Sequence, residues 1–228
     1  MLRNKQYLYI AIFIMLVSAL SYLFSLAPAS KQQIKIQLLW QNDVLDCQST
    51  FMAGEDNKTW FVEQLQFFIH DIQFGSNETG WEKVNLVDNF YQTGDSVLLG
   101  KNCQQTQLDD SVDSTGNWQV EFYSDANITA NSRMKFTLGL PFESNHLNPI
   151  SQKSPLNLPS MFWVWQTGHK FMRLELASSN EQWLFHLGST GCQSASVMRA
   201  PNERCRNPNL FHFEVPAAKN NGNQYALN

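Results

Sequence analysis

The segment Met172–Leu176, with the sequence MRLEL, shows the pattern that decides the fold of this chain, since apolar residues at 172, 174 and 176 alternate with polar ones. Strict alternation is typical of a β-strand with one face in the core and the other in water. The same alternation recurs in four further segments, which span residues 34–40, 67–74, 134–138 and 211–215. Within residues 67–74, it predicts one shared face for Phe68, His70, Ile72 and Phe74.

Turn-forming residues separate these segments, for example between Gly75 and Gly80. Several short strands punctuated in this way predict an all-β, sandwich-like antiparallel domain. One segment departs from the pattern. Ser160–Gly168 begins with a residue suited to a helix N-cap and ends with a glycine suited to the position after a helix. We expect one short inserted helix of about two turns there.

The N-terminus has the pattern of an export signal. Arg3 and Lys5 precede an uncharged apolar run over residues 7–26, which closes on Ala27-Pro28-Ala29. A small-x-small ending of this kind is typical of a cleaved signal peptide. The run also approaches the ~20 residues that span a bilayer, so an uncleaved N-terminal anchor is the alternative. Both interpretations place the rest of the chain in the periplasm or at the cell surface.

The exported part is acidic. The chain has 16 Lys and Arg, of which two lie in residues 1–29, so residues 30–228 carry 14 against 20 Asp and Glu, a net charge of −6 with His neutral. Without clustered basic residues, this balance argues against a nucleic-acid partner, and membrane contact is expected only through an uncleaved anchor. We expect residues 1–29 to be a signal peptide or anchor, 30–216 to form one β domain and 217–228 to be a flexible tail.

All four cysteines, Cys47, Cys103, Cys192 and Cys205, lie in the exported part. None belongs to a C-x-x-C pair, which argues against a thiolate zinc site or haem attachment. In an oxidising compartment an even number of cysteines predicts disulfides. We favour Cys192–Cys205, which closes a short loop, and by elimination Cys47–Cys103. A cysteine–copper site is the alternative.

The sequence lacks the motifs of common enzymes. Gly188–Gly191 (GSTG) is in the wrong register for the G-x-S-x-G motif of hydrolases. The chain also has no phosphate-binding glycine loop, no H-E-x-x-H pair and no calcium loop. The histidines are the remaining candidates, because imidazole is the commonest transition-metal ligand and copper is a natural candidate outside the cytoplasm. His146 lies in a loop and His186 in an expected strand, whereas His70 and His212 fit sheet faces as ordinary structural residues.

Four runs of sequence resemble the four-cysteine MbnP-like family. They are PFESNHLNP (141–149), SPLNLPSMFWVWQTGHKFMRLEL (154–176), FHLGSTGC (185–192) and CRNPN (205–209). The likeness covers about residues 34–215. Members of this family are exported copper proteins of the "metallo-mystery pair" system, first linked to methanobactin operons. This chain departs from the family pattern at His169, where tyrosine is usual.

The resemblance implies a partner, a MauG-like di-haem cytochrome c peroxidase, which oxidises a tryptophan to kynurenine before copper binds. An indole nitrogen is a poor ligand because its lone pair belongs to the ring, whereas ring opening yields an aryl amine and a ketone. Trp163 and Trp165 are the candidates for this modification, with Trp163 slightly preferred.

Together with His146 and His186, and with His169 as an additional candidate, the oxidised tryptophan would hold one copper ion. We therefore expect a copper-binding substrate of a haem enzyme that is not itself an enzyme. The alternative is an exported β-sandwich interaction module without metal.

Overall fold

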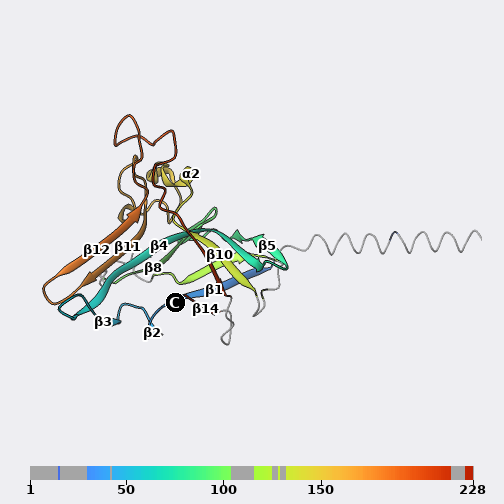
Figure 1. Ribbon diagram of the computed structural model, residues 1–228. Coiled ribbons are helices and arrows are strands. Elements are labelled where there is room, and N and C mark those ends of the chain that lie inside the picture. Colours follow the sequence, from blue (N-terminus) through green and yellow to red (C-terminus); the bar gives the residue numbers. More distant parts are fainter. Residues whose placement is uncertain are drawn as a thin grey trace, which may run out of the picture. The chain divides into compact units, whose positions relative to one another are not determined.

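The computed structural model describes residue 15 and residues 30–41, 43–103, 116–124, 128, 132–216 and 224–227 (Figure 1). The chain divides into two compact units, Met1–Ser30 and Lys31–Asn228. The predicted leader over residues 1–29 lies outside the described residues except for Met15. Across the described ranges, no helix has both the length and the apolar character needed to cross a membrane. The following description concerns the second unit.

The larger of two sheets has nine strands among the described residues and is built around the 19-residue strand β4 (Lys58–Ser76). Its antiparallel path runs through β12 (Gln182–Gly188), β11 (Lys170–Ala177), β4, β10 (Arg133–Leu138) and β13 (Phe211–Pro216). Off this path lie β3 (Thr50–Ala53), β5 (Gly80–Lys83) and β8 (Ser96–Asn102), which pair with β4, and β7 (Gln92–Thr93), which pairs with β8. The centre of β4, residues 64–70, is buried on both faces, and it combines the apolar Leu65 and Phe67-Phe68-Ile69 with the buried polar side chains of Gln64, Gln66 and His70.

The smaller sheet has the order β14 (Gln224–Leu227), β1 (Lys31–Trp40), β9 (Gln119–Tyr123) and β6 (Asn85–Leu86), with β2 (Asp43–Val44) also paired to β1. β14 runs parallel to β1, and the other pairs are antiparallel. β14 lies within the segment 217–228, for which the sequence predicts a flexible tail. Its four residues are too few to show a period-two pattern.

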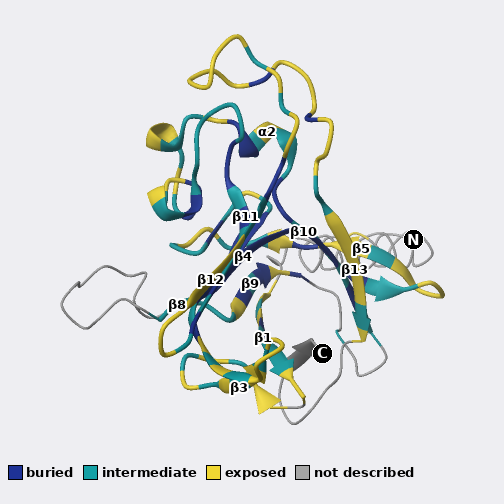
Figure 2. Cartoon of the chain, turned by 60° about the vertical axis from the view of Figure 1, so that its left-hand side comes forward, coloured by how far each residue is buried: buried dark blue, intermediate teal, exposed yellow. Residues whose placement is uncertain are grey.

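The main core lies between the two sheets. β1 and β9 contribute Ile34, Ile36, Val120 and Phe122, which pack with residues of β4, β8 and β10 such as Phe67, Ile69, Val97, Leu99 and Met134. Buried strands therefore run through the middle of the domain (Figure 2). The predicted all-β, antiparallel sandwich is confirmed, and each of the five alternating segments forms a strand or part of one.

The predicted face of β4 is wrong. Asp71 has a φ of 51°, and the register against β10 shifts between Lys135 and Thr137. This bulge adds one residue to β4 and reverses the side-chain alternation beyond it. As a result Ile72 and Phe74 join the main core, while Phe68 belongs to a second, smaller core.

The short helix lies elsewhere than predicted. The structure has one at α2 (Phe142–Asn145), together with the 3-10 turns η2 (Pro149–Ser151) and η3 (Pro159–Met161). After η3 the chain becomes extended, and Phe162 forms a β-bridge with His169. The Trp163 amide donates to the Gly168 carbonyl, which closes a loop instead of a helix. Within this loop the Thr167 and Gly168 amides both donate to the Val164 carbonyl, which makes a single turn.

Both predicted disulfides, Cys47–Cys103 and Cys192–Cys205, are present. The second lies in the long connection between β12 and β13, which meets α2 at one end of the domain (Figures 1 and 2). The smaller core supports this end and consists of Phe68, Leu98, Leu140, Leu156, Met161 and Phe171.

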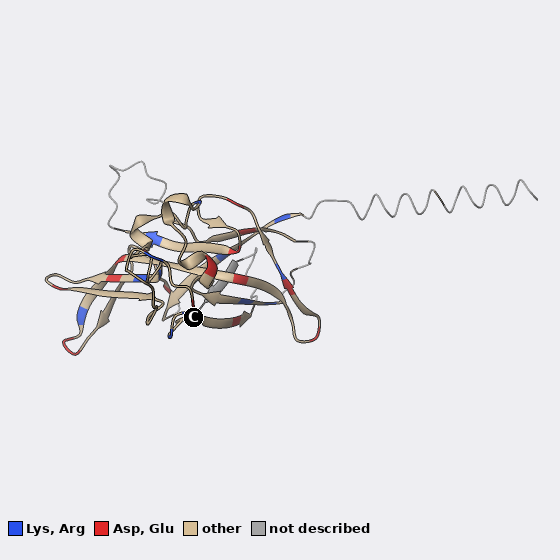
Figure 3. Ribbon diagram, turned by 90° about the horizontal axis from the view of Figure 1, so that it is seen from above, with Lys and Arg blue, Asp and Glu red and all other residues tan. Residues whose placement is uncertain are grey.

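In the part of the chain that the structure describes, charged residues are dispersed over the strands and not gathered on one of them (Figure 3). Many form ion pairs across neighbouring segments, such as Arg133 with Glu214 and Lys58 with Glu181. Pairs at such exposed positions contribute about 0–1 kcal/mol each, so they solubilise the domain more than they stabilise it.

Candidate metal centre

His146 follows directly after α2 and is buried, with 5% of its surface exposed. Its Nδ1 lies 3.1 Å from the Trp165 carbonyl oxygen, and its Nε2 lies 3.2 Å from the Asn145 side-chain nitrogen. A carbonyl only accepts, so Nδ1 carries the proton and Nε2 keeps a lone pair. Burial lowers the pKa of the His146 imidazole, and the carbonyl bond offsets this only in part. The ring is therefore held neutral, as a metal ligand must be.

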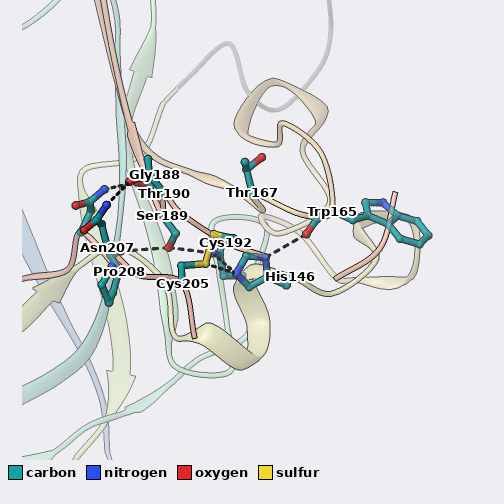
Figure 4. The surroundings of a disulfide bond; sticks show 12 residues. His146, Trp165, Thr167, Gly188, Ser189, Thr190, Cys192, Cys205, Asn207 and Pro208 are labelled. Carbon is teal, nitrogen blue, oxygen red and sulfur yellow. Dashed lines mark hydrogen bonds between the residues drawn. A yellow bond between two sulfur atoms is a disulfide. The ribbon is translucent and has the colours of Figure 1, made fainter. Parts of the chain in front are cut away.

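The lone pair of His146 lies beside the second disulfide (Figure 4). Cys205 Sγ is 3.5 Å from Nε2, and the ligand atoms of His146, Cys192 and Cys205 all lie within 4.8 Å of one another. Among the described residues this is the one group of three potential ligands of the His, Cys, Asp and Glu types. Since the two sulfur atoms are bonded to each other, only the imidazole is a strong donor in this state.

His169 lies next to His146 but is fully buried. Its Nδ1 and Nε2 each lie 2.8 Å from a carbonyl oxygen, of Asn145 and Leu156 respectively. Its backbone amide donates to the Asn145 side chain at 2.7 Å. Burial lowers the pKa of the His169 imidazole, although the two carbonyls act in the opposite direction. Neither ring nitrogen of His169 is open to a metal in this arrangement. The hydrogen bonds of His169 to Asn145 instead connect α2 to the start of β11.

Glycine is required where this strand begins. Gly168 has a φ of 77°, and a Cβ there would lie 2.5 Å from the Asn145 side-chain oxygen. Only glycine combines this left-handed backbone with so close an approach. The Gly168-His169 dipeptide and Asn145 therefore act together to fix the position of His146.

His186 lies on β12, opposite Arg173 of β11. Its Nε2 is 2.7 Å from Oε1 of Glu175, a carboxylate that is 6% exposed and also accepts from Arg173. Burial alone raises the pKa of the Glu175 carboxyl, but hydrogen bonds from His186 and Arg173 bring it below its ordinary value. The ionised carboxylate accepts a hydrogen bond from the Nε2–H group, so the lone pair of the His186 ring lies on Nδ1.

The two candidate tryptophans have different surroundings. The Trp163 ring lies 6.5 Å from the His186 ring, centroid to centroid, and packs on Gly188, where a Cβ would be 2.6 Å from its Cζ3 atom. Trp165 contributes its backbone carbonyl to His146, while its indole points away from the disulfide (Figure 4). The structure thus brings Trp163 to His186, and His146 to the disulfide.

Within the described part of the chain, His146 and His186 do not belong to one group of three ligands. The other two histidines serve the sheet. His70 Nδ1 bonds the Gly139 carbonyl at 2.9 Å, and the exposed His212 bonds the Thr137 hydroxyl at 2.8 Å.

Sequence reasoning did not identify Asn145 or Glu175 as residues that orient the histidines. Asn145 directly precedes His146 in the sequence, whereas Glu175 is eleven residues away from His186. The pairing of Glu175 with His186 depends on the register between β11 and β12, which no local pattern reveals.

Comparison with known proteins agrees with this architecture. A model of the MbnP family matches residues 29–228. A solved structure described as MbnP from Methylosinus trichosporium aligns over 82% of this chain and 72% of that chain, with a TM-score of 0.67 and 17% sequence identity. No curated protein is significantly similar in sequence. Because the family match covers far more than half of the chain, this chain belongs to the MbnP family.

Proposed function

We propose that this protein is an exported copper-binding protein of the periplasm or cell surface whose site is completed by oxidation of a tryptophan. Membership of the MbnP family and the ligand group around His146 fit a copper-binding role. The ligands would be His146, His186 and the oxidised Trp163, and the protein would bind copper without catalysing a reaction. Imidazole nitrogen suits copper in either oxidation state.

The observation that carries this proposal is the packing of Trp163 against His186 and Gly188. An intact indole offers no lone pair to a metal. Conversion to kynurenine opens the five-membered ring and exposes an aryl amine and a ketone close to His186. We propose a MauG-like di-haem peroxidase as the partner that performs this oxidation. The Trp165 indole points away from the disulfide beside His146 (Figure 4), whereas the Trp163 ring lies near the ring of His186, so we favour Trp163 over Trp165.

His146 and His186 are each oriented by a hydrogen bond from one ring nitrogen to an oxygen acceptor. The Trp165 carbonyl orients His146, and the Glu175 carboxylate orients His186. A hydrogen bond on the far side of the ring fixes the tautomer and raises the basicity of a metal-binding imidazole.

The proposal is tested by copper content. Protein co-produced with its haem partner should contain one kynurenine and bind one copper tightly, whereas protein produced alone should fold and bind copper weakly. Mass spectrometry must accompany the copper measurement. Tight stoichiometric binding by protein with intact tryptophans would contradict the proposal.

A second candidate function, an interaction module without metal, has one observation in its favour. Trp183 and Phe185 stack at 6.0 Å on β12 and are 46% and 39% exposed. β12 ends the path of the larger sheet, so these rings lie on an edge strand. Exposed aromatic residues are typical of protein contacts. Absence of copper from protein purified with its haem partner would favour this function.

A further inference from the structure

The disulfide beside His146 holds two sulfur atoms in the position of metal ligands. A disulfide sulfur is a weak donor, whereas a thiolate binds soft cations strongly. We propose that reduction of Cys192–Cys205 creates an alternative metal site, with His146 Nε2 and two thiolates as ligands. It would take a thiophilic cation such as Cu(I) or Zn(II). This site exists only in the reduced protein, so metal binding there reports the redox state of the disulfide.

The geometry needs little adjustment. The three ligand atoms already lie within 4.8 Å of one another. Zinc–sulfur bonds of about 2.3 Å at tetrahedral angles place two sulfurs about 4 Å apart. Once the disulfide is reduced, the two sulfurs need to separate only to this spacing, while all three ligand atoms stay close together. Cys192 is partly exposed, and its neighbours Gly191 and Gln193 are exposed. Cys192 is therefore the more accessible of the two cysteines.

His146 supplies the nitrogen without rearrangement. Its Nδ1–H is engaged by the Trp165 carbonyl, and its Nε2 faces Cys205 Sγ at 3.5 Å. The Asn145 amide that now donates to Nε2 has a second acceptor, the Ser189 hydroxyl at 3.4 Å. A cation can therefore replace the amide at Nε2 while Asn145 keeps one of its partners.

The reduction step follows ordinary thiol–disulfide exchange with a dithiol as the reductant. One thiolate of the dithiol attacks Cys192 Sγ, the more exposed sulfur, and Cys205 leaves as a thiolate. The second thiol of the reductant then displaces Cys192, so that the dithiol becomes a disulfide and two electrons pass to the protein. The two protons of the dithiol pass to the cysteines or to water, and metal binding takes up the thiolates.

Cys205 lies in a basic segment, since Arg204 and Arg206 flank it in sequence and Arg204 lines the same pocket as Cys205. Positive charge near a sulfur stabilises its thiolate. A pocket of about 220 Å³ reaches Cys205 and is lined by Arg204, Glu143 and Ser189 among others. Water therefore has access to the leaving sulfur, although the residue itself is only 6% exposed.

This inference shares His146 with the proposed copper site but needs neither His186 nor an oxidised tryptophan. The two proposals can therefore fail independently. Protein made without the haem partner has intact tryptophans and is the right material, since the proposed copper site is incomplete in it.

The test uses the full chain made in this way, reduced with a dithiol, freed of reductant under anaerobic conditions and titrated with Cd(II). Cadmium is thiophilic and does not reoxidise thiols, and its thiolate complexes absorb in the near ultraviolet. Circular dichroism of the same samples reports the fold. The matched variants are His146→Ala, which keeps both thiols, His212→Ala, which removes an exposed histidine, and the double variant Cys192→Ser/Cys205→Ser, which keeps Cys47 and Cys103.

We expect one equivalent of Cd(II) to bind the folded reduced protein with a thiolate absorption band, and the oxidised protein to show none. His212→Ala should behave like the parent, and His146→Ala should bind at least about tenfold more weakly. The double variant measures any band that the reduced Cys47 and Cys103 contribute, and the parent should exceed it by one equivalent of Cd(II). Four results would each overturn the inference: equal binding by oxidised protein, undiminished binding by His146→Ala, a band in the double variant equal to that of the parent, or loss of the native fold on reduction.

Discussion

At the scale of single residues, the two candidate copper ligands are held in the same manner although they come from different elements. His146 donates through Nδ1 to a backbone carbonyl, and His186 donates through Nε2 to a buried carboxylate. Each ring is left with one lone pair of fixed direction. His169 differs, since both its nitrogens face carbonyl oxygens.

The proposed ligand set predicts distinct outcomes for three alanine variants, with His169→Ala as a fourth that tests the alternative, in protein co-produced with the proposed haem partner. His146→Ala and His186→Ala should each abolish tight copper binding, while the exposed His212→Ala should leave it unchanged. Copper titration measures the loss, and melting curves must show that the fold survives. The ligand assignment fails if His169→Ala removes copper and His146→Ala does not.

Glu175 is expected to act on copper through His186. Glu175→Gln keeps the size of the side chain but weakens the acceptor of the Nε2 proton, so copper affinity should fall about 10–100-fold. Competition with a copper chelator measures the change. Glu214→Gln is the matched control, because Glu214 pairs with Arg133 at the surface. An equal effect of the two variants would show that general charge, and not His186, is responsible.

Residue type and resemblance led to the proposal of both histidines and Trp163 from the sequence, and this ligand assignment stays a prediction. They were not sufficient to identify Glu175, because its role arises from strand pairing between β11 and β12. The burial of His169 was also hidden, since it depends on two carbonyl oxygens from segments up to 24 residues away.

At the scale of elements, strands that alternate strictly were predictable, and elements fixed by tertiary contacts were not. The bulge at Asp71 reverses the faces of β4 because one added residue changes the side-chain parity. The helix expected over 160–168 is replaced by a loop that the Trp163–Gly168 hydrogen bond closes. The helix-capping residues Ser160 and Gly168 therefore do not outweigh the β-bridge between Phe162 and His169.

The last residue of β12 controls the position of Trp163. Gly188→Ala would place a methyl group 2.6 Å from the Trp163 ring, and such overpacking costs about 1–3 kcal/mol. We expect the indole to move away from His186, with a lower yield of kynurenine and less bound copper. Near-ultraviolet circular dichroism and peptide mass spectrometry measure the two effects. Leu184→Ala, at an exposed position of the same strand, should change neither, and a Gly188→Ala variant with a full yield of kynurenine would contradict this packing argument.

At the scale of the whole molecule, buried histidines link stability to pH. Burial lowers the pKa values of His70, His146 and His169 below the ordinary value of 6.5. Above that value both folded and unfolded chains are neutral at these positions. Below it the unfolded chain takes up protons first, so the free energy of unfolding falls as the pH decreases.

Urea unfolding at several pH values tests this linkage. The midpoint should be constant above about pH 6.5 and should decline below it. The lowered carboxyl pKa of Glu175 adds a further loss only below its ordinary value of 4.5. A midpoint that is flat or rises as the pH falls from 6.5 to 4.5 would contradict the burial of these imidazoles as the structure has it.

The most direct test of the copper proposal is to locate the modified residue and the copper in the same samples. Parent, Trp163→Phe and Trp165→Phe proteins would each be co-produced with the di-haem peroxidase and then analysed by peptide mass spectrometry and copper titration. The account predicts kynurenine at position 163 and one tightly bound copper in the parent and in Trp165→Phe, and neither in Trp163→Phe. Kynurenine and tight copper binding that persist in Trp163→Phe would contradict it.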